Sequence, residues 1–483
     1  MDSNHINNLF LRSALTEENP FMTNADVLQW IEERKKDVFV DIEKIKFSDL
    51  KEWKLDHNKG NLHHKSGRFF SIEGIKVQTN TGEVQQWYQP IINQPEIGLL
   101  GIITKEIDGI LYFLLQAKIE PGNLNLVQLA PTLQATESNF KQVHKGSKPE
   151  FLNYFINPKQ DSIMLNQLQS EQGARFLKKR NRNIIVYTED NIKDRKDFLW
   201  LTLGQIKKLM KFNNVVNMDT RTVISGIPYG RYSPDQLALF ETYNLKTNEN
   251  TFSYDLLISS LDYDSSLHSY DEIISWFTTL KAKHELKVER KSLFDLQGWK
   301  ISDEEIYNER NKYFKVFVAN ISIENREVKS WQQPLIKPID DGIIAFVIKK
   351  INGIMHLLVQ AKLECGNYDI LEMAPTVQCI TDSYDVSEDL PFLNYVLNAE
   401  PDQIKLDTLQ SEEGGRFFQE QNRNLIIQAD ENFPEEIPEN YIWMTISQLN
   451  MFLKFNNYLN IQSRSLLAAV DFLQEFEFIS GEL

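Results

Sequence analysis

Polar and charged side chains are concentrated between residues 116 and 139. The stretch carries amide, hydroxyl, amine and carboxyl groups, namely Gln116, Lys118, Glu120, Asn123, Asn125, Gln128, Thr132, Gln134, Ser138 and Asn139. Loops next to strands commonly carry binding residues, and a few convergent polar groups fix a ligand in its site. The stretch therefore predicts hydrogen bonding to a polar ligand.

Groups suited to proton transfer and to anion binding flank this stretch. His64 and His144 are imidazoles that titrate near neutral pH, although either is also open to a structural role. The basic run KKRNR at residues 178–182 includes Arg180 and Arg182. Guanidinium groups match phosphate oxygens, so this run predicts a diphosphate clamp, with a solvated helix end as the alternative.

The sequence lacks the short motifs of several common enzyme classes. It contains no GxxxxGK[ST], GxGxxG, HExxH or GxSxG pattern, which disfavours kinase, dehydrogenase, zinc-protease and lipase chemistry. Two cysteines, Cys365 and Cys379, are too few for a thiolate zinc site or a disulfide framework. We expect both to be reduced core residues.

The blocks that carry these residues occur twice, in the same order. QAKIEPGN at residue 116 returns as QAKLECGN at residue 360. QSEQGARF at residue 169 returns as QSEEGGRF at residue 410, and WYQP at residue 87 returns as WQQP at residue 331. Self-similarity of this kind indicates duplicated structural units. We expect a first repeat at 1–225, a linker at 226–268 and a second repeat at 269–483.

Both copies predict the same secondary structure. Asp-Gly at 108–109 and Asn-Gly at 352–353 each separate two apolar stretches and favour the positive φ angles of a tight β-hairpin. Thr202 and Thr445 each begin a capping box ahead of apolar residues at helical spacing. The four-residue spacing within Glu171–Arg175 is that of a helical ion pair. Strands and helices do not alternate as in a doubly wound sheet, so each repeat is predicted to be α+β.

The composition is that of a folded protein that does not bind nucleic acid. Hydrophobic residues make up 42 % and charged residues 25 % of the 483 positions, which is ordinary for globular proteins. The net charge of −16 repels polyanions. The amino terminus does not resemble a secretion signal, and the longest apolar run, at 342–348, is too short for a membrane span. We expect a cytoplasmic protein with a buried strand at 342–348.

The two copies differ in several polar residues. Those that occur in the first repeat only include His64, Asn125, Gln128, Ser138, Asn139 and His144. Residues shared by the copies can serve the scaffold, whereas residues of one copy can serve function. The difference predicts that the working site belongs to the first repeat.

The longer blocks resemble the NDP-hexose 2,3-dehydratase family. The resemblance rests on HHKSGRFFSIEG, WYQPIINQPEIGLLG, QAKIEPGNLNLVQLAPTLQATESN, VHKG, LQSEQGARF and KRNRN, and continues in WQQPLI, QAKLECGN, APTVQC and QSEEGGRFF. It implies a homodimer of chains with two Nudix-hydrolase-like α+β domains in tandem, each a mixed sheet with flanking helices. It also implies one active nucleotide-sugar pocket, which we expect in the first repeat, and one vestigial pocket.

The resemblance further implies the activity. A dTDP-linked 4-keto-6-deoxyhexose loses the proton at carbon 3 and then the hydroxyl at carbon 2 as water, giving a dTDP-3,4-diketo-2,6-dideoxyhexose with no cofactor. An NADPH-dependent 3-ketoreductase is the expected partner downstream. The candidates for proton transfer are His64, Lys118, Glu120 and His144.

The remaining candidates are expected to bind the substrate. They are Trp87, Tyr88, Gln89, Asn123, Asn125, Gln128, Thr132, Gln134, Ser138, Asn139, Arg175, Arg180 and Arg182. The aromatic pair is expected to stack on thymine, with a core tryptophan as the alternative. Amides and hydroxyls are expected to stabilise the enolate, and the arginines to hold the diphosphate.

Two other functions stay open. A Nudix-type nucleotide-sugar diphosphatase would release a nucleoside monophosphate with Mg²⁺, but the acidic Nudix helix motif is replaced by QSEQG and SEEGG. Since Mg²⁺ needs near-octahedral oxygen ligands, we expect no metal. A non-catalytic nucleotide-sugar-binding protein would leave the sugar unchanged.

Overall fold

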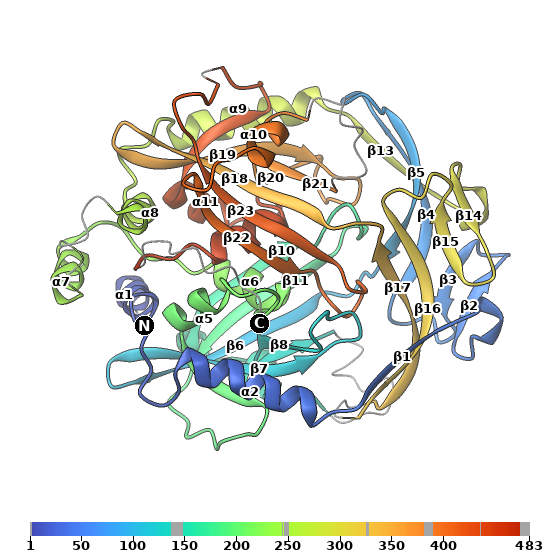
Figure 1. The fold of residues 1–483 in the computed structure, drawn as a ribbon, viewed down its shortest axis with the longest axis horizontal. Helices are drawn as coiled ribbons and strands as arrows, with labels where there is room; N and C mark the ends of the chain where they lie inside the picture. Colours follow the sequence, from blue (N-terminus) through green and yellow to red (C-terminus); the bar gives the residue numbers. More distant parts are fainter. Residues whose placement is uncertain are drawn as a thin grey trace.

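The computed structural model describes residues 2–136, 148–243, 245, 251–324, 328–380, 390–434 and 436–473. These residues form two seven-stranded and two five-stranded sheets. The five-stranded sheets lie together on one side of the molecule, and the seven-stranded sheets and most helices form the rest (Figure 1).

The first repeat begins with two helices, continues with runs of strands interrupted by short helices, and ends with two helices. Its elements are α1 (Ser3–Ala14), α2 (Asn24–Lys36), β1 (Val40–Ile45), η1 (Phe47–Asp49), β2 (Trp53–Asp56), β3 (Asn61–His64), β4 (Ser71–Thr79), β5 (Gln86–Asn93), β6 (Gly98–Ile107), β7 (Ile110–Ile119), β8 (Val127–Pro131), β9 (Leu133–Ala135), α4 (Asn153–Ile156), η2 (Gln160–Ser162), β10 (Ile163–Ser170), β11 (Arg180–Tyr187), β12 (Phe198–Thr202), α5 (Leu203–Leu209) and α6 (Met218–Ser225).

The second repeat follows nearly the same order. After α7 (Pro234–Thr242) come α8 (Phe252–Leu261), α9 (Tyr270–Lys283), β13 (Leu286–Lys291), η4 (Leu293–Asp295), β14 (Trp299–Ile301), β15 (Glu305–Asn308), β16 (Phe314–Ile323), β17 (Ser330–Pro338), β18 (Gly342–Ile351), β19 (Ile354–Leu363), β20 (Leu371–Ala374), β21 (Val377–Ile380), α10 (Leu393–Leu397), β22 (Ile404–Ser411), β23 (Gln421–Gln428), β24 (Tyr441–Thr445), α11 (Ile446–Phe452) and α12 (Ile461–Ala468).

The seven-stranded sheets have the same topology. One has the order β10-β11-β6-β7-β12, with β8 on β7 and β9 on β6, and the other has β22-β23-β18-β19-β24, with β20 on β19 and β21 on β18. The β6–β11 and β18–β23 pairs are parallel, while the neighbouring pairs are antiparallel. This mixed topology confirms the predicted α+β class.

The local predictions at turns and helix starts are also confirmed. Asp108, Gly109, Asn352 and Gly353 have φ values of 50°, 79°, 52° and 85°, as the turns of the β6–β7 and β18–β19 hairpins require. The predicted capping boxes open α5 and α11. The apolar run at 342–348 lies in β18 and is buried.

The repeats exchange their first strands. β1 of the first repeat pairs antiparallel with β16 of the second, from Val40 opposite Ile323 to Ile45 opposite Val318. In return, β13 of the second repeat pairs antiparallel with β4 of the first. Each five-stranded sheet is therefore built from both repeats.

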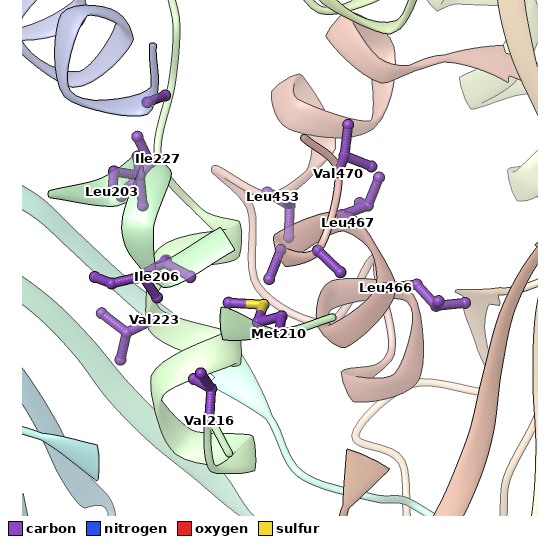
Figure 2. Close-up of a cluster of buried hydrophobic side chains, with 14 of the residues drawn as sticks. Leu203, Ile206, Met210, Val216, Val223, Ile227, Leu453, Leu466, Leu467 and Val470 are labelled. Carbon is purple, nitrogen blue, oxygen red and sulfur yellow. The ribbon is translucent and has the colours of Figure 1, made fainter. Parts of the chain in front are cut away.

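The repeats also share one hydrophobic core. Figure 2 shows apolar side chains in and beside α5 and α6 facing those in and beside α12, with Met210, which follows α5, near Leu453, which follows α11. A second shared cluster surrounds Phe176 and Phe417, whose ring centroids are 5.8 Å apart. Because apolar burial drives folding, these clusters hold the repeats in one fixed arrangement.

Two segments differ from the expectations. Residues 226–268, expected as a linker, contain two helices, α7 and α8, and α8 packs on β19 and α11 as α1 packs on β7 and α5. The predicted helix over Glu171–Arg175 is wrong, because these residues form a turn after β10. Glu171 accepts a hydrogen bond from Asn181, while the Arg175 guanidinium lies 4.2 Å from the Phe314 ring centroid.

Over the described ranges, every helix is too short or too polar to cross a bilayer.

Candidate active site

A cavity of about 120 Å³ lies where the large sheet of the first repeat meets the second repeat. We call it the first site. Its polar lining from the first repeat includes Lys118, Glu120, Gln134, Glu171, Lys179, Asn181 and Asp219, and that from the second includes Trp331, Gln333, Glu413 and Arg416.

Contacts between two glycine-containing loops place residues of the second repeat in the first site. The backbone N–H of Gly122 donates to the carbonyl of Gly414 at 2.7 Å. A Cβ atom on Gly122 would lie 1.6 Å from the carbonyl oxygen of Phe417, so only glycine permits this approach. In the reciprocal contact, the backbone N–H of Gly366 donates to the carbonyl of Gly173, also at 2.7 Å. The loop after β7 therefore meets the turn that carries Glu413.

A chain of amide side chains fixes one wall of the first site. Gln134 of β9 donates to the Glu120 carboxylate at 2.9 Å, and Asn217 donates to the Gln134 carbonyl oxygen at 3.3 Å. Asn217 is also the N-cap of α6, since its side chain accepts from the N–H of Thr220 at 2.8 Å. The network joins the β7 loop to the start of α6 and positions Asp219.

Asp219 is the most deeply buried carboxyl group in the lining, with 3 % of its surface exposed. Burial raises the pKa of Asp219 well above its usual value, and the charges of Glu413, Glu171 and Glu120 raise it further. Lys118 opposes this shift of the pKa by favouring the carboxylate. A buried carboxyl with a raised pKa suits proton transfer near neutral pH.

Burial also shifts the pKa values of Lys179 and Glu413 in the lining. Burial lowers the pKa of Lys179 to about 8, with Glu171 opposing, and its amine donates to the carbonyl of Glu96. Burial raises the pKa of Glu413 to about 8, with Arg416 as the largest opposing charge. The site thus combines cations that can meet a diphosphate with carboxyls that can hold a proton.

Arg416 reaches the first site across the repeat boundary. Its guanidinium lies 4.1 Å from the Phe70 ring centroid, and its Nη2 donates to Gln94 at 3.1 Å. Trp331 and Gln333 lie beside it, with the indole N–H donating to the Gln333 carbonyl oxygen at 2.9 Å. A planar cation and an indole at one cavity suit a phosphate and an aromatic base.

Three of the predicted site residues line this cavity, namely Lys118, Glu120 and Gln134. His64 lies elsewhere, in β3, where its ring packs against Trp53 and Phe69 and its Nε2 is 3.6 Å from Glu52. The predicted residues Ser138, Asn139 and His144 lie outside the described residues.

The predicted Trp87, Tyr88 and Gln89 are not among the residues that line the first site, where Trp331 and Gln333 of the second repeat lie instead. Trp87 donates to Gln89 at 2.9 Å, as Trp331 does to Gln333. The Tyr88 carbonyl accepts a hydrogen bond from the Trp299 indole.

Four further predicted residues bind other parts of the protein. The Asn123 amide donates to the carbonyl of Leu126 at 3.0 Å, and the Asn125 amide to that of Asn214 at 2.8 Å. Gln128 accepts from Ser411 at 2.9 Å, and Thr132 accepts from the N–H of Ile103 at 3.0 Å. These contacts hold loops and strands in place, and none of the four residues is among those that line the cavity.

The three arginines predicted as a diphosphate clamp are not among the residues that line the first site. Arg180 lies over the Tyr368 ring at 4.0 Å, and Arg182 donates to Asn166 at 2.8 Å. The charge of Arg175 acts on Glu364 and Glu420 of the second repeat. Lys179 and Arg416 are the basic residues that join Lys118 at the first site.

The sequence-based search missed the lining residues Lys179, Asn181, Asp219, Trp331, Gln333, Glu413 and Arg416 as site residues. The repeat itself contained a signal for three of them. Where the first site has Asp219, Lys179 and Glu413, the corresponding positions of the other repeat hold Gln462, Glu420 and Gln172.

Within the described part of the chain, no three His, Cys, Asp or Glu side chains are grouped closely enough to hold a metal ion.

A family model described as NDP-hexose 2,3-dehydratase matches residues 24–227 and 270–470. The chain belongs to this family. A protein of Saccharopolyspora spinosa named dTDP-4-dehydro-6-deoxy-alpha-D-glucopyranose 2,3-dehydratase is 42 % identical over 95 % of this chain and 94 % of its own length. Proteins of the same name from Amycolatopsis orientalis and Streptomyces violaceoruber are 41 % and 40 % identical, over 95 % and 87 % of this chain and 92 % and 91 % of their own lengths.

Proposed function

We propose that the protein is a hydro-lyase that removes water across carbons 2 and 3 of a dTDP-linked 4-keto-6-deoxyhexose. The product is a dTDP-3,4-diketo-2,6-dideoxyhexose, a precursor in deoxysugar biosynthesis. The observation that carries the proposal is membership of the 2,3-dehydratase family over both repeats, with relatives of that name at about 40 % identity over nearly their whole lengths.

The first site is the place proposed for this reaction, and the corresponding positions of the second repeat form the vestigial one. Its cations suit the diphosphate of such a substrate: Lys179 and Arg416 line the cavity together with Lys118. In the second repeat, Glu420 stands where the first has Lys179, so a cation is replaced by an acid. Because the net charge of −16 repels anions, an anionic ligand needs local cations, and this favours the first site.

The chemistry needs groups that move protons and groups that stabilise an enolate. Loss of the carbon 3 proton, acidified by the 4-keto group, places negative charge on the carbon 4 oxygen. Lys118 supplies a positive charge inside the cavity, and Gln134 supplies an amide already oriented by Glu120 and Asn217. Both are proposed to face the sugar.

Several finer features belong to the same proposal. The mixed sheet of each repeat with its flanking helices is taken as Nudix-like, and the working form as a homodimer in the cytoplasm. An NADPH-dependent 3-ketoreductase is proposed to consume the diketo product, which is chemically labile.

The test is incubation of the purified chain with dTDP-4-keto-6-deoxyglucose without added metal, with a 3-ketoreductase and NADPH present as a trap. Mass spectrometry of the nucleotide fraction should show a species that has lost one water and gained two hydrogens. Free dTMP would show a diphosphatase instead, and bound but unchanged substrate would show a binding protein.

A further inference from the structure

Asp219 is a buried carboxyl group at the first site, and its position in the first turn of α6 does not explain why an acidic residue is present there. Acidic residues are common in the first turn of a helix, where they meet the positive end of the helix dipole. The corresponding helix of the second repeat, α12, has Gln462 at this position and is nevertheless formed. The scaffold therefore does not need a carboxylate here.

The same hydrogen-bond chain supports these two positions. In the first repeat Asn217 donates to Gln134 and Gln134 to Glu120; in the second, Asn460 donates to Gln378 at 2.7 Å and Gln378 to Glu364 at 3.0 Å. Asn217 and Asn460 both cap their helices. The same frame thus presents a carboxyl in one repeat and an uncharged amide in the other.

A second carboxyl of the first site shows the same contrast. Glu413 approaches from the second repeat and lines the cavity, and its charge acts on Asp219. Its counterpart in the first repeat is Gln172. Where carboxylates share a desolvated site, each disfavours ionisation of the other and makes it a stronger base.

We propose that Asp219 is the catalytic residue that takes the proton from carbon 3 of the sugar, in a site that Glu413 of the other repeat completes. This inference rests on the proposed function. Glu413 acts as a positioning residue that sets the proton affinity of Asp219 through their shared field.

The proposed step balances within the enzyme and one substrate. The Asp219 carboxylate takes the carbon 3 proton, and the electron pair of the C–H bond forms a double bond between carbons 3 and 4, with negative charge on the carbon 4 oxygen. The enolate then forms the double bond between carbons 2 and 3 as the bond from carbon 2 to its hydroxyl breaks. The protonated Asp219 gives its proton to the departing hydroxide, which leaves as water and restores the carboxylate. The enol at carbon 3 then tautomerises to the ketone.

The test compares Asp219→Asn with Gln462→Asn, which place the same side chain at the two corresponding positions. For dTDP-4-keto-6-deoxyglucose with the ketoreductase trap, kcat should fall about 10³-fold in Asp219→Asn, the range expected for losing a general base, while KM and the melting temperature stay near those of the wild type. Gln462→Asn should keep the wild-type kcat.

A second variant separates a lost base from a lost fold. In Asp219→Ala, added formate should act as a replacement base and raise the rate at least tenfold, whereas Asp219→Asn should not respond. A kcat for Asp219→Asn within tenfold of the wild type would overturn the proposal. A formate response that is equal in the two variants, or absent from both, would also overturn it. Loss of both dTDP binding and thermal stability in Asp219→Asn would do the same. A wild-type chain that binds the substrate and releases no water would instead refute the proposed function.

Discussion

The first site and the corresponding positions of the second repeat are built on the same frame but carry different charges. Both have a Glu–Gln–Asn chain that ends at a helix cap. The first has Asp219 and Lys179 where the second has Gln462 and Glu420. The frame and the chemistry are therefore separable in this fold, because the side-chain hydrogen bonds of the frame are kept while the charged residues beside them change.

The comparison also shows that neither site belongs to one repeat. Arg416 and Glu413 of the second repeat line the first site. Arg175 of the first repeat acts on Glu364 and Glu420 of the second. Substitutions at matched positions can therefore test the two sites against each other within one molecule.

After Asp219, the largest effect of breaking the asymmetry is expected at Glu413. Glu413→Gln gives the first site the residue type that Gln172 has in the other repeat. We expect kcat to fall about 10- to 100-fold, since the variant removes the charge that raises the pKa of Asp219. The acidic limb of the pH–rate profile should move to lower pH, because the base then ionises more readily.

Gln172→Asn is the matched control for this experiment, and its kcat should equal that of the wild type. An unshifted acidic limb in Glu413→Gln, measured from pH 5 to 9 on the trapped reaction, would contradict the coupling between the two carboxyls.

The next effect concerns affinity rather than rate. Lys179→Gln removes a cation from the first site, and a charge-assisted contact to a phosphate is worth about 1.5–3 kcal/mol. We expect KM and the dissociation constant of dTDP to rise about 10-fold or more, with kcat changed less. Calorimetric titration of dTDP checks this, with Glu420→Gln as the matched control. Only Lys179→Gln should bind dTDP more weakly than the wild type at the first site. Equal affinity in Lys179→Gln and the wild type would remove Lys179 from the diphosphate contacts.

The smallest effect is on stability and its pH dependence. Ser170 donates to Glu372 at 2.8 Å, and the matched pair is Ser411 with Gln128 at 2.9 Å. Burial raises the pKa of Glu372 to about 8, above its value of roughly 4.3 in an unfolded chain. The folded state therefore holds a proton that the unfolded state releases, so this contribution to stability is complete below about pH 4.3 and is lost as the pH rises toward 8.

Glu372→Gln should flatten this loss. Chemical unfolding of the wild type at pH 5, 6, 7 and 8 should show a decline that is weaker in the variant by at most about 1.4 kcal/mol per pH unit. Gln128→Glu should steepen the decline, because it introduces the same buried carboxyl in the other repeat. Parallel curves for all three proteins would show that Glu372 is ionised in the folded state at neutral pH.

Much of the scaffold could be predicted from the sequence because it depends on local patterns that occur twice. The hairpin turns at Asp108 and Asn352 and the capping boxes at Thr202 and Thr445 are encoded within a few residues. The exchange of β1 and β13 could not be predicted in this way, since strand partners far apart in the chain leave no short-range pattern. The turn at Glu171 was mistaken for a helix because a four-residue charge spacing also occurs in turns.

The site was only partly predictable for the same reason. Lys118, Glu120 and Gln134, which line the cavity, could be predicted as site residues because all three belong to the polar stretch at residues 116–139. Asp219 and Glu413 are 194 residues apart, as their numbers show, and meet only because the two glycine loops bring the repeats into contact. Amides such as Asn125 and Gln128 bond to other parts of the protein, as polar groups within a fold do whether or not a ligand binds, so their role at the site stays a prediction.

The exchanged strands β1 and β13 bear on how such a molecule can arise. Each half lacks an edge strand of its own small sheet and receives it from the other half, as in two identical chains that swap an element on dimerising. A single-length ancestor with this fold would have worked only as a pair, with two equal sites across its symmetry axis. Two such copies joined in one chain keep the paired arrangement, and each site can then change without the other. Cutting the present chain between its halves should therefore yield two polypeptides that are insoluble apart and reassemble when expressed together.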